Sequence, residues 1–306
     1  MDKKHIGSGY FGEWTEDEFG QPVYWYKCNQ VKDYRAVTPV NPIWRAPAEH
    51  THQVGNDRLV AVVSNDGTIR VRQDEGSPKY LNDFYPPKHQ YAGGFGYLTD
   101  GRNTLSTYYS GEEESFDRFF GTGYVKKIVR AKGYRVAQTV FAPFGDDPLL
   151  ISQVEVTNEG ISEAMLRWVE YWGCRIYQFS FRAMLASVLS GGFENTSFIR
   201  RRMADSFHNH IEILDGGCGL ICHQSFQGWG EEDVRAWDTM QELISSSASG
   251  LLGGTTIPPL PEISFDDLSP PPTFLVSLDE PADGWESDAA CFFGEGGAKS
   301  PSGMQN

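Results

Sequence analysis

Short runs in which apolar and polar residues alternate recur along this chain, and turn-forming residues separate them. The clearest run covers residues 150–158 and follows a Pro/Gly/Asp-rich turn at 141–148. One face of this run carries Leu150, Ser152, Val154 and Val156, and the other carries Ile151, Gln153, Glu155 and Thr157. Alternation with a period of two directly after a turn predicts a half-buried antiparallel strand.

Four glycine-containing turns predict β-hairpins between such runs. They lie at 66–67, 100–101, 132–133 and 215–217. Glycine, and asparagine or aspartate beside it, adopts the positive φ angles that tight hairpins need. Repeated hairpins predict an all-β chain folded as a large antiparallel two-sheet sandwich. Helices are few: residues 231–244 have helical spacing, and residues 181–189 fit either a helix or a strand.

The character of the chain changes after residue 245. We expect residues 1–245 to form one β-sandwich domain and residues 246–273 to form a Pro/Gly/Ser-rich loop. Residues 274–293 would supply a final strand region of the same domain. Residues 294–306 are polar and rich in glycine and serine, which predicts a linker or a frayed end.

The formal net charge of −15 limits the classes of partner that the chain can bind. An acidic surface repels phosphate backbones, so we expect no nucleic-acid partner. No apolar run reaches the roughly 18 residues of a membrane span, so we expect no membrane partner. The start of the chain has no apolar signal core, which predicts a cytoplasmic protein. Five scattered cysteines are more typical of reduced thiols than of a disulfide framework.

Several segments resemble, in order, the amino-terminal domain of glycoside hydrolase family 94, the cellobiose-phosphorylase-like enzymes. The run Phe141-Ala142-Pro143-Phe144-Gly145-Asp146-Asp147-Pro148, with the strand ending at Thr157-Asn158, is similar to that family's aromatic, proline and aspartate signature. The other similar segments are Gly9-Tyr10-Phe11, Pro42-Ile43-Trp44, 55–58 and 168–172. The relatives implied include glycoside phosphorylases related to cyclic β-1,2-glucan synthase.

The resemblance implies a galactose-mutarotase-like β-supersandwich that contacts carbohydrate and acts as a scaffold. In that family a β-glycosidic bond is cleaved by inorganic phosphate, and the catalytic aspartate lies in a helical barrel after the β-domain. No succession of amphipathic helices follows residue 245 here. We therefore expect the barrel to be missing from this chain, no catalytic residue in it, and no cofactor beyond the phosphate of the full enzyme. A second copy of the chain is an expected partner, as is the missing barrel.

Aromatic residues crowd the first 50 positions and supply the candidate carbohydrate-binding residues. Sugar C–H faces pack on aromatic rings, while their hydroxyls need charged or amide partners nearby. The candidates are Trp14, Trp25, Trp44, Arg45, Asp57 and Arg58, with a β-glucan or β-glucoside as the ligand. The tryptophans could instead fill the core or an interface with a missing domain.

Two alternatives stay open from the residues. The first is a free-standing enzyme of the aldose-1-epimerase kind, which uses a histidine acid and a glutamate base; its histidine candidates are His50, His52, His208 and His210. The second is a non-catalytic module for carbohydrate binding or self-association. A zinc site made by His208 and His210 with Cys218, Cys222 and His223 has poor spacing, so no metal is expected.

Overall fold

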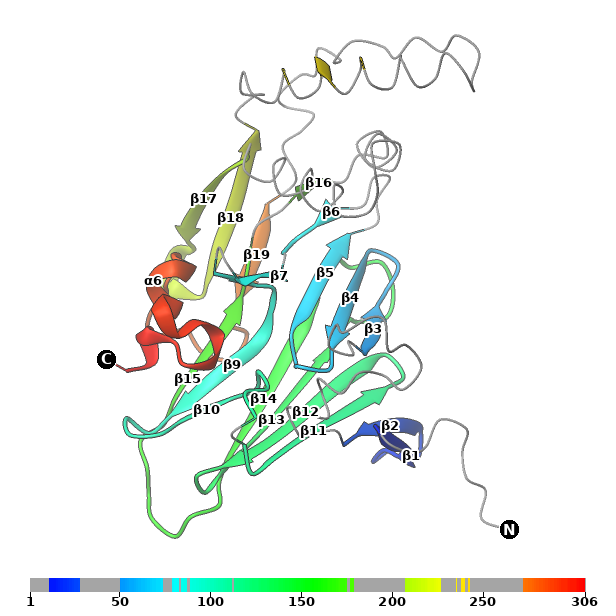
Figure 1. Cartoon of the computed structure of the whole chain (residues 1–306), viewed down its shortest axis with the longest axis vertical. Helices are drawn as coiled ribbons and strands as arrows, with labels where there is room; N and C mark the ends of the chain where they lie inside the picture. Colours follow the sequence, from blue (N-terminus) through cyan, green and yellow to red (C-terminus); the bar gives the residue numbers. More distant parts are fainter. Residues whose placement is uncertain are drawn as a thin grey trace. The chain divides into compact units, whose positions relative to one another are not determined.

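The structure, a computed structural model, describes residues 11–27, 50–73, 79–82, 84–86, 89–111, 113–174, 177–178, 207–226, 235, 238–239, 242 and 272–305 (Figure 1). The segment 181–189 lies outside these ranges, as does most of the expected helix at 231–244. The four described residues of that helix are helical. The chain divides into two compact units, a first of residues 1–73, 82–173 and 288–306 and a second of residues 74–81 and 174–287.

A six-stranded antiparallel sheet forms the largest part of the first unit. Its strands, in spatial order, are β1 (Gly12–Glu16), β2 (Pro22–Tyr26), β11 (Ser115–Gly121), β12 (Tyr124–Ala131), β13 (Tyr134–Phe141) and β14 (Ile151–Asn158). Residues 132–133 turn β12 into β13, and both have a positive φ. The hairpin expected at this position is therefore present.

Two further antiparallel sheets and one small hairpin belong to the same unit. The first sheet has the order β10 (Thr104–Ser106), β9 (Gly93–Thr99) and β15 (Arg167–Trp172). The second joins β5 (Ile69–Gln73), β4 (Leu59–Ser64) and β3 (Thr51–Gly55). The hairpin pairs β7 (Phe84–Tyr85) with β8 (Gln90–Tyr91). The turns expected at 66–67 and 100–101 join β4 to β5 and β9 to β10.

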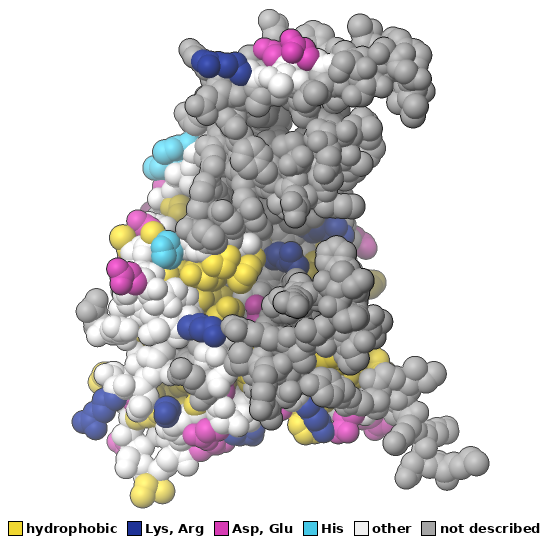
Figure 2. All heavy atoms as spheres, in the orientation of Figure 1, with side chains coloured by type: hydrophobic (Ala, Val, Ile, Leu, Met, Phe, Trp, Pro, Cys, Tyr) yellow, Lys and Arg dark blue, Asp and Glu magenta, His cyan; other side chains and the backbone are white. Residues whose placement is uncertain are grey.

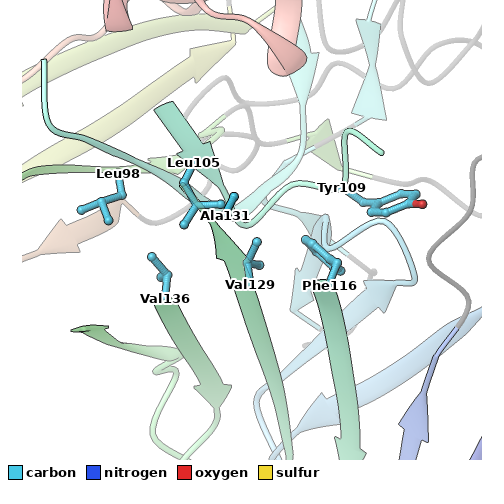
Figure 3. Close-up of a cluster of buried hydrophobic side chains, with 7 residues drawn as sticks. All are labelled: Leu98, Leu105, Tyr109, Phe116, Val129, Ala131 and Val136. Carbon is cyan, nitrogen blue, oxygen red and sulfur yellow. The ribbon is translucent and has the colours of Figure 1, made fainter. Parts of the chain in front are cut away.

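The core of the first unit lies where apolar faces of these sheets meet (Figure 3). Figure 3 shows Leu98 of β9 and Leu105 of β10 pointing toward Val129 of β12 and Val136 of β13. Phe116 of β11 is fully buried in the same cluster. Packing of one antiparallel sheet on another confirms the predicted all-β sandwich class.

Strand β14 confirms the predicted alternation, but it is less buried than a central strand. Its residues Ser152, Val154 and Val156 lie opposite Val140, Gln138 and Val136 of β13, so they share one face. Val156 is nevertheless 39% exposed. The physical reason is position, because β14 is the last strand of its sheet in the described fold and only β13 flanks it.

The C-terminal residues differ from the expected linker or frayed end. They form α6 (Ala289–Phe293) and the 3₁₀ turns η3 (Gly294–Lys299) and η4 (Ser302–Met304), which Figure 1 shows near β9. Phe293, Ala298 and Met304 are buried, and the Tyr97 hydroxyl donates to the Ala298 carbonyl oxygen at 2.6 Å. Three spaced apolar side chains thus fix a segment whose glycine and serine content suggested a linker.

The second unit contains a three-stranded antiparallel sheet among its described residues. Its strands are β17 (Phe207–Ile213), β18 (Gly219–Phe226) and β19 (Thr273–Val276). The turn η2 (Asp215–Gly217) joins β17 to β18, as expected from the sequence, and β19 matches the expected final strand. A short antiparallel pair of β6 (Lys79–Tyr80) and β16 (Tyr177–Gln178) belongs to the same unit.

The described surface carries charges of both signs. Figure 2 shows lysine and arginine side chains interspersed with aspartate and glutamate side chains on one face. The chain has a net charge of −15, yet basic side chains lie among the acidic ones on this face and can form local ion pairs with them. Within the part of the chain that the structure describes, no helix has the length and apolar character needed to cross a membrane.

Candidate functional site

Trp14 and Trp25 lie on the paired strands β1 and β2, but they face opposite sides of the sheet. Trp14 is directly opposite Tyr24, whereas Trp25 is directly opposite Glu13. Successive side chains of a strand point to opposite faces, so the two tryptophans cannot form one platform. The Trp14 ring is 39% exposed and meets the Tyr24 ring edge-on, with 5.4 Å between centroids.

Trp25 is the centre of a group of five side chains on one face of β1, β2 and β11. This group, called the Trp25 cluster below, consists of Glu13, Trp25, Lys27, Asp117 and Phe119. The Trp25 and Phe119 rings stack with 5.7 Å between centroids, and the indole Nε1 donates to Asp117 Oδ1 at 3.0 Å. The Lys27 ammonium lies 3.6 Å from the Trp25 ring centroid and pairs with Glu13. The cluster therefore joins aromatic surface to charged groups of both signs.

Asp57 and Arg58 belong to a different place on the first unit. The Asp57 backbone N–H donates to the Gly145 carbonyl oxygen at 3.1 Å. Arg58 Nε donates to the Asp146 carbonyl oxygen at 3.1 Å, and its guanidinium pairs with the Asp146 carboxylate at 3.4 Å. These contacts hold the turn between β13 and β14, and strands β11 and β12 separate β13 from β2. The structure does not bring these residues to the Trp25 cluster, and Trp44 and Arg45 lie outside the described residues.

The Asn56 side chain forms four hydrogen bonds that connect the loop 56–59 to the turn 143–147. Its Nδ2 donates to the carbonyl oxygens of Pro143 at 2.9 Å and Asp147 at 2.8 Å. Its Oδ1 accepts from the backbone N–H groups of Arg58 at 3.0 Å and Leu59 at 3.2 Å. One amide side chain thus satisfies four backbone groups from two segments that are distant in sequence.

Replacing Asn56 by alanine should destabilise the first unit by about 2 kcal/mol, because four backbone groups lose their partner at once. Arg58→Ala should cost under about 1 kcal/mol, because the side chains of its ion pair with Asp146 are 40% and 72% exposed, and solvent weakens such a pair. Urea unfolding of the two variants measures the difference. If Arg58→Ala proved less stable than Asn56→Ala, Asn56 would not be the main stabilising contact between the loop and the turn 143–147.

A second group of polar side chains, called the buried polar centre below, lies between β12–β14 and β15. Its centre is the carboxylate of Glu170. Oε1 accepts from Gln138 Nε2 at 2.8 Å, from Ser152 Oγ at 2.8 Å and from Trp172 Nε1 at 3.2 Å. Oε2 accepts from Trp168 Nε1 at 2.9 Å. Four donors from three strands therefore converge on one carboxylate.

Lys127 is fully buried on the same face of the sheet as Gln138. Its ammonium donates to the Gly67 carbonyl oxygen at 3.0 Å and to the Gly94 carbonyl oxygen. Loss of water around the amine lowers the pKa of Lys127 to about 7, although Glu170 and Asp66 act in the opposite direction. Burial likewise raises the pKa of Glu170 above its usual range. These opposed shifts are those expected of an acid and a base taken out of water together.

Sequence reasoning missed the buried polar centre, although the pattern contained a signal. Trp168, Glu170 and Trp172 alternate in β15, which places the carboxylate on the same face as both indoles. Lys127 alternates with Val125 and Val129 in β12, so it occupies an inward position. A charged residue at an inward position needs polar partners inside the fold. The inward positions of Lys127 and Glu170, which have opposite charges, therefore indicate a shared polar centre.

The buried polar centre has limited capacity for an added ligand. The chain itself supplies four donors to Glu170 and two carbonyl acceptors to Lys127. Buried polar groups that are paired within the chain in this way are typical of a network that fixes how two sheets pack. The Trp25 cluster differs, because the side chains of Glu13 and Lys27 keep 50% and 37% of their surface exposed. A ligand in solution can therefore reach polar groups of the Trp25 cluster without opening the fold.

Among the described contacts, neither His50 nor His52 meets a glutamate. His50 Nδ1 bonds to the Tyr26 hydroxyl at 3.0 Å, and His52 Nε2 bonds to the Gly121 carbonyl oxygen at 2.9 Å. Burial lowers the pKa of both rings. His208 and His210 are exposed, and His210 pairs with Glu212 at 3.0 Å on the surface of β17.

The zinc arrangement considered from the sequence is also not assembled. His210 lies directly opposite His223, whereas Cys222 lies opposite Ile211 and so points to the other face of the sheet. Cys218 lies beside the turn η2 and donates to the Asp215 carbonyl oxygen at 3.6 Å. Across the described ranges, no group of three or more histidine, cysteine, aspartate or glutamate side chains could hold a metal ion.

Contacts within the first unit link three of the segments that carry the resemblance to family 94, namely 55–58, 141–158 and 168–172, whereas 42–44 and residues 9 and 10 lie outside the described residues. Residues 56–58 hold the turn 143–147, and Glu170 of the segment 168–172 accepts from Ser152 of β14. These contacts explain the segments as structural parts of one domain. Comparison of the sequence with protein-family models gave no match, and comparison with curated proteins gave none either.

Proposed function

We propose that this chain is a carbohydrate-contacting scaffold domain of an enzyme similar to the family 94 glycoside phosphorylases and hydrolases, with β-glucosides or β-glucans as the ligand class. The antiparallel sandwich and the mutual contacts of segments 55–58, 141–158 and 168–172 support this proposal. In this role the catalytic acid and the inorganic phosphate belong to a helical barrel domain. The β-domain itself contributes shape and sugar contacts.

The observation that carries the proposal is the composition of the Trp25 cluster. The stacked Trp25 and Phe119 rings provide an apolar surface of the kind that packs against sugar C–H groups. A sugar on the Trp25 ring would displace the Lys27 ammonium that lies over it. Asp117 and Glu13 supply acceptors for hydroxyl groups beside these rings, and Lys27 supplies a donor. A few polar groups placed around aromatic surface are typical of small-ligand sites.

Replacing Trp25 by alanine should weaken binding of β-linked gluco-oligosaccharides by about tenfold, which corresponds to about 1.4 kcal/mol. The expected cause is loss of the ring that packs against the sugar. Calorimetric titration of the wild-type and variant chains measures the change. Phe19→Ala is the matched control, because Phe19 is an aromatic residue that is 77% exposed and lies in the turn between β1 and β2.

Two outcomes of this comparison would contradict the proposal. Equal affinities of the wild-type and Trp25→Ala chains would remove the sugar contact from the Trp25 cluster. Release of a sugar phosphate by the purified chain, given a β-glucoside and inorganic phosphate, would place the chemistry in this domain. Urea unfolding of Trp25→Ala shows whether the variant is still folded. The comparison of affinities is valid only if β2 stays paired in the variant.

A further inference from the structure

The second unit holds two cysteines in contact. Cys222 lies on β18, is 3% exposed, and donates through Sγ to the Cys174 carbonyl oxygen at 3.7 Å. Cys174 is partly exposed, and its thiol lies within hydrogen-bonding reach of the Cys222 thiol. Both thiols are free in the structure. The two sulfur atoms are therefore neighbours without a covalent bond.

The surroundings of the pair give the two thiols different reactivity. The hydrogen bond from the Cys174 thiol lowers the pKa of Cys222, and the same contact raises the pKa of Cys174. Thr273, which lies directly opposite Cys222 on β19, bonds to the Cys174 thiol. Because the thiolate is the reactive form, we expect Cys222 to react first with a peroxide that is small enough to reach this buried side chain.

We propose that Cys174 and Cys222 form a reversible intrachain disulfide when the protein meets a hydroperoxide. The Cys222 thiolate attacks one peroxide oxygen, which gives a sulfenic acid and, after protonation, one molecule of water. The Cys174 sulfur then attacks the sulfenic sulfur and displaces the second water. Two thiols and one hydrogen peroxide thus yield one disulfide and two waters, and the thiols are oxidised as the peroxide is reduced.

The structure also describes contacts of Cys218 and Cys291, whereas Cys28 lies outside the described residues. Cys218 donates to the Asp215 carbonyl oxygen beside turn η2, and Cys291 donates to the Asp288 carboxylate in the first unit. A disulfide between 174 and 222 would close the loop of residues 175–221 and tie its start to β18. Cross-links of this kind reduce the conformational freedom of the unfolded chain.

The test treats the purified full chain with hydrogen peroxide, blocks the remaining thiols by alkylation, and maps the peptides by mass spectrometry without reduction. We expect two of the five thiols to be lost, one peptide pair that links Cys174 to Cys222, and full reversal by a dithiol reductant. Cys218→Ser is the matched control, and it should form the same link.

The variants Cys174→Ser and Cys222→Ser separate the two steps. Cys174→Ser lacks the resolving thiol, so Cys222 should accumulate as a sulfenic acid that a cyclic dione reagent captures. Cys222→Ser should leave Cys174 available for alkylation after the same treatment. A link between any other two cysteines, or alkylation of both Cys174 and Cys222 after peroxide treatment, would overturn the proposal.

Discussion

Replacing Glu170 by alanine should lower the free energy of unfolding of the first unit by about 3–5 kcal/mol. The variant removes the acceptor of Gln138, Ser152 and two indole N–H groups in one step. It also removes one of the two acidic groups, Glu170 and Asp66, that favour the charged form of the buried Lys127 amine. Urea unfolding followed by tryptophan fluorescence measures the effect, because Trp168 and Trp172 flank the site and report on it.

Glu155→Ala is the matched control for this experiment. Glu155 is an exposed glutamate on β14 of the same unit, so its removal should change stability by no more than about 0.5 kcal/mol. Glu170→Gln keeps one acceptor oxygen and should fall between the wild type and Glu170→Ala. A loss below about 1 kcal/mol in Glu170→Ala would show that the buried polar centre does not hold the two sheets together.

The second large effect is on the pH dependence of stability, and it comes from Lys127. The pKa of its buried amine is about 7, below the value of 10.5 for an exposed lysine. Between these two values the unfolded chain binds more protons than the folded chain, so the free energy of unfolding rises with pH. We expect Lys127 to contribute about 2–4 kcal/mol to this rise between pH 7 and pH 10.

The variant Lys127→Met has no group that titrates at this position and fills a similar volume. The difference in unfolding free energy between wild type and variant should therefore change with pH across this window. Lys126→Met is the matched control, because Lys126 is the neighbouring residue on the opposite, outer face of β12. A difference that is constant from pH 7 to pH 10 would mean that Lys127 keeps an ordinary pKa in the folded protein.

Local turn chemistry explains why much of the fold could be predicted from the sequence. The hairpins at 66–67, 100–101, 132–133 and 215–217 depend on residues that sit beside one another, and glycine marks each of them. The faces of β14 followed from alternation alone, which is also a local property. The low burial of β14 could not be predicted from alternation, because burial also depends on whether a strand lies at the edge of its sheet.

The remaining features depend on contacts between distant parts of the chain. The C-terminal segment has the composition of a linker, and what fixes it is Tyr97, 201 residues earlier than Ala298. Trp14 and Trp25 are close in sequence, yet the β1–β2 register places them on opposite faces. Asp57 and Arg58 form hydrogen bonds with the turn at 143–147 and do not lie beside Trp25. Sequence alone identified suitable residue types, and pairing between strands decided which of them meet.

The proposed carbohydrate contact is tested most directly by calorimetric titration of the wild-type chain with two oligosaccharides of equal length. One is a β-linked gluco-oligosaccharide and the other is its α-linked counterpart. Saturable heat with the β-linked sugar, and at least tenfold weaker binding of the α-linked sugar, is the result that the proposal predicts. No heat with either sugar at millimolar concentration, or equal affinity for both, would contradict it.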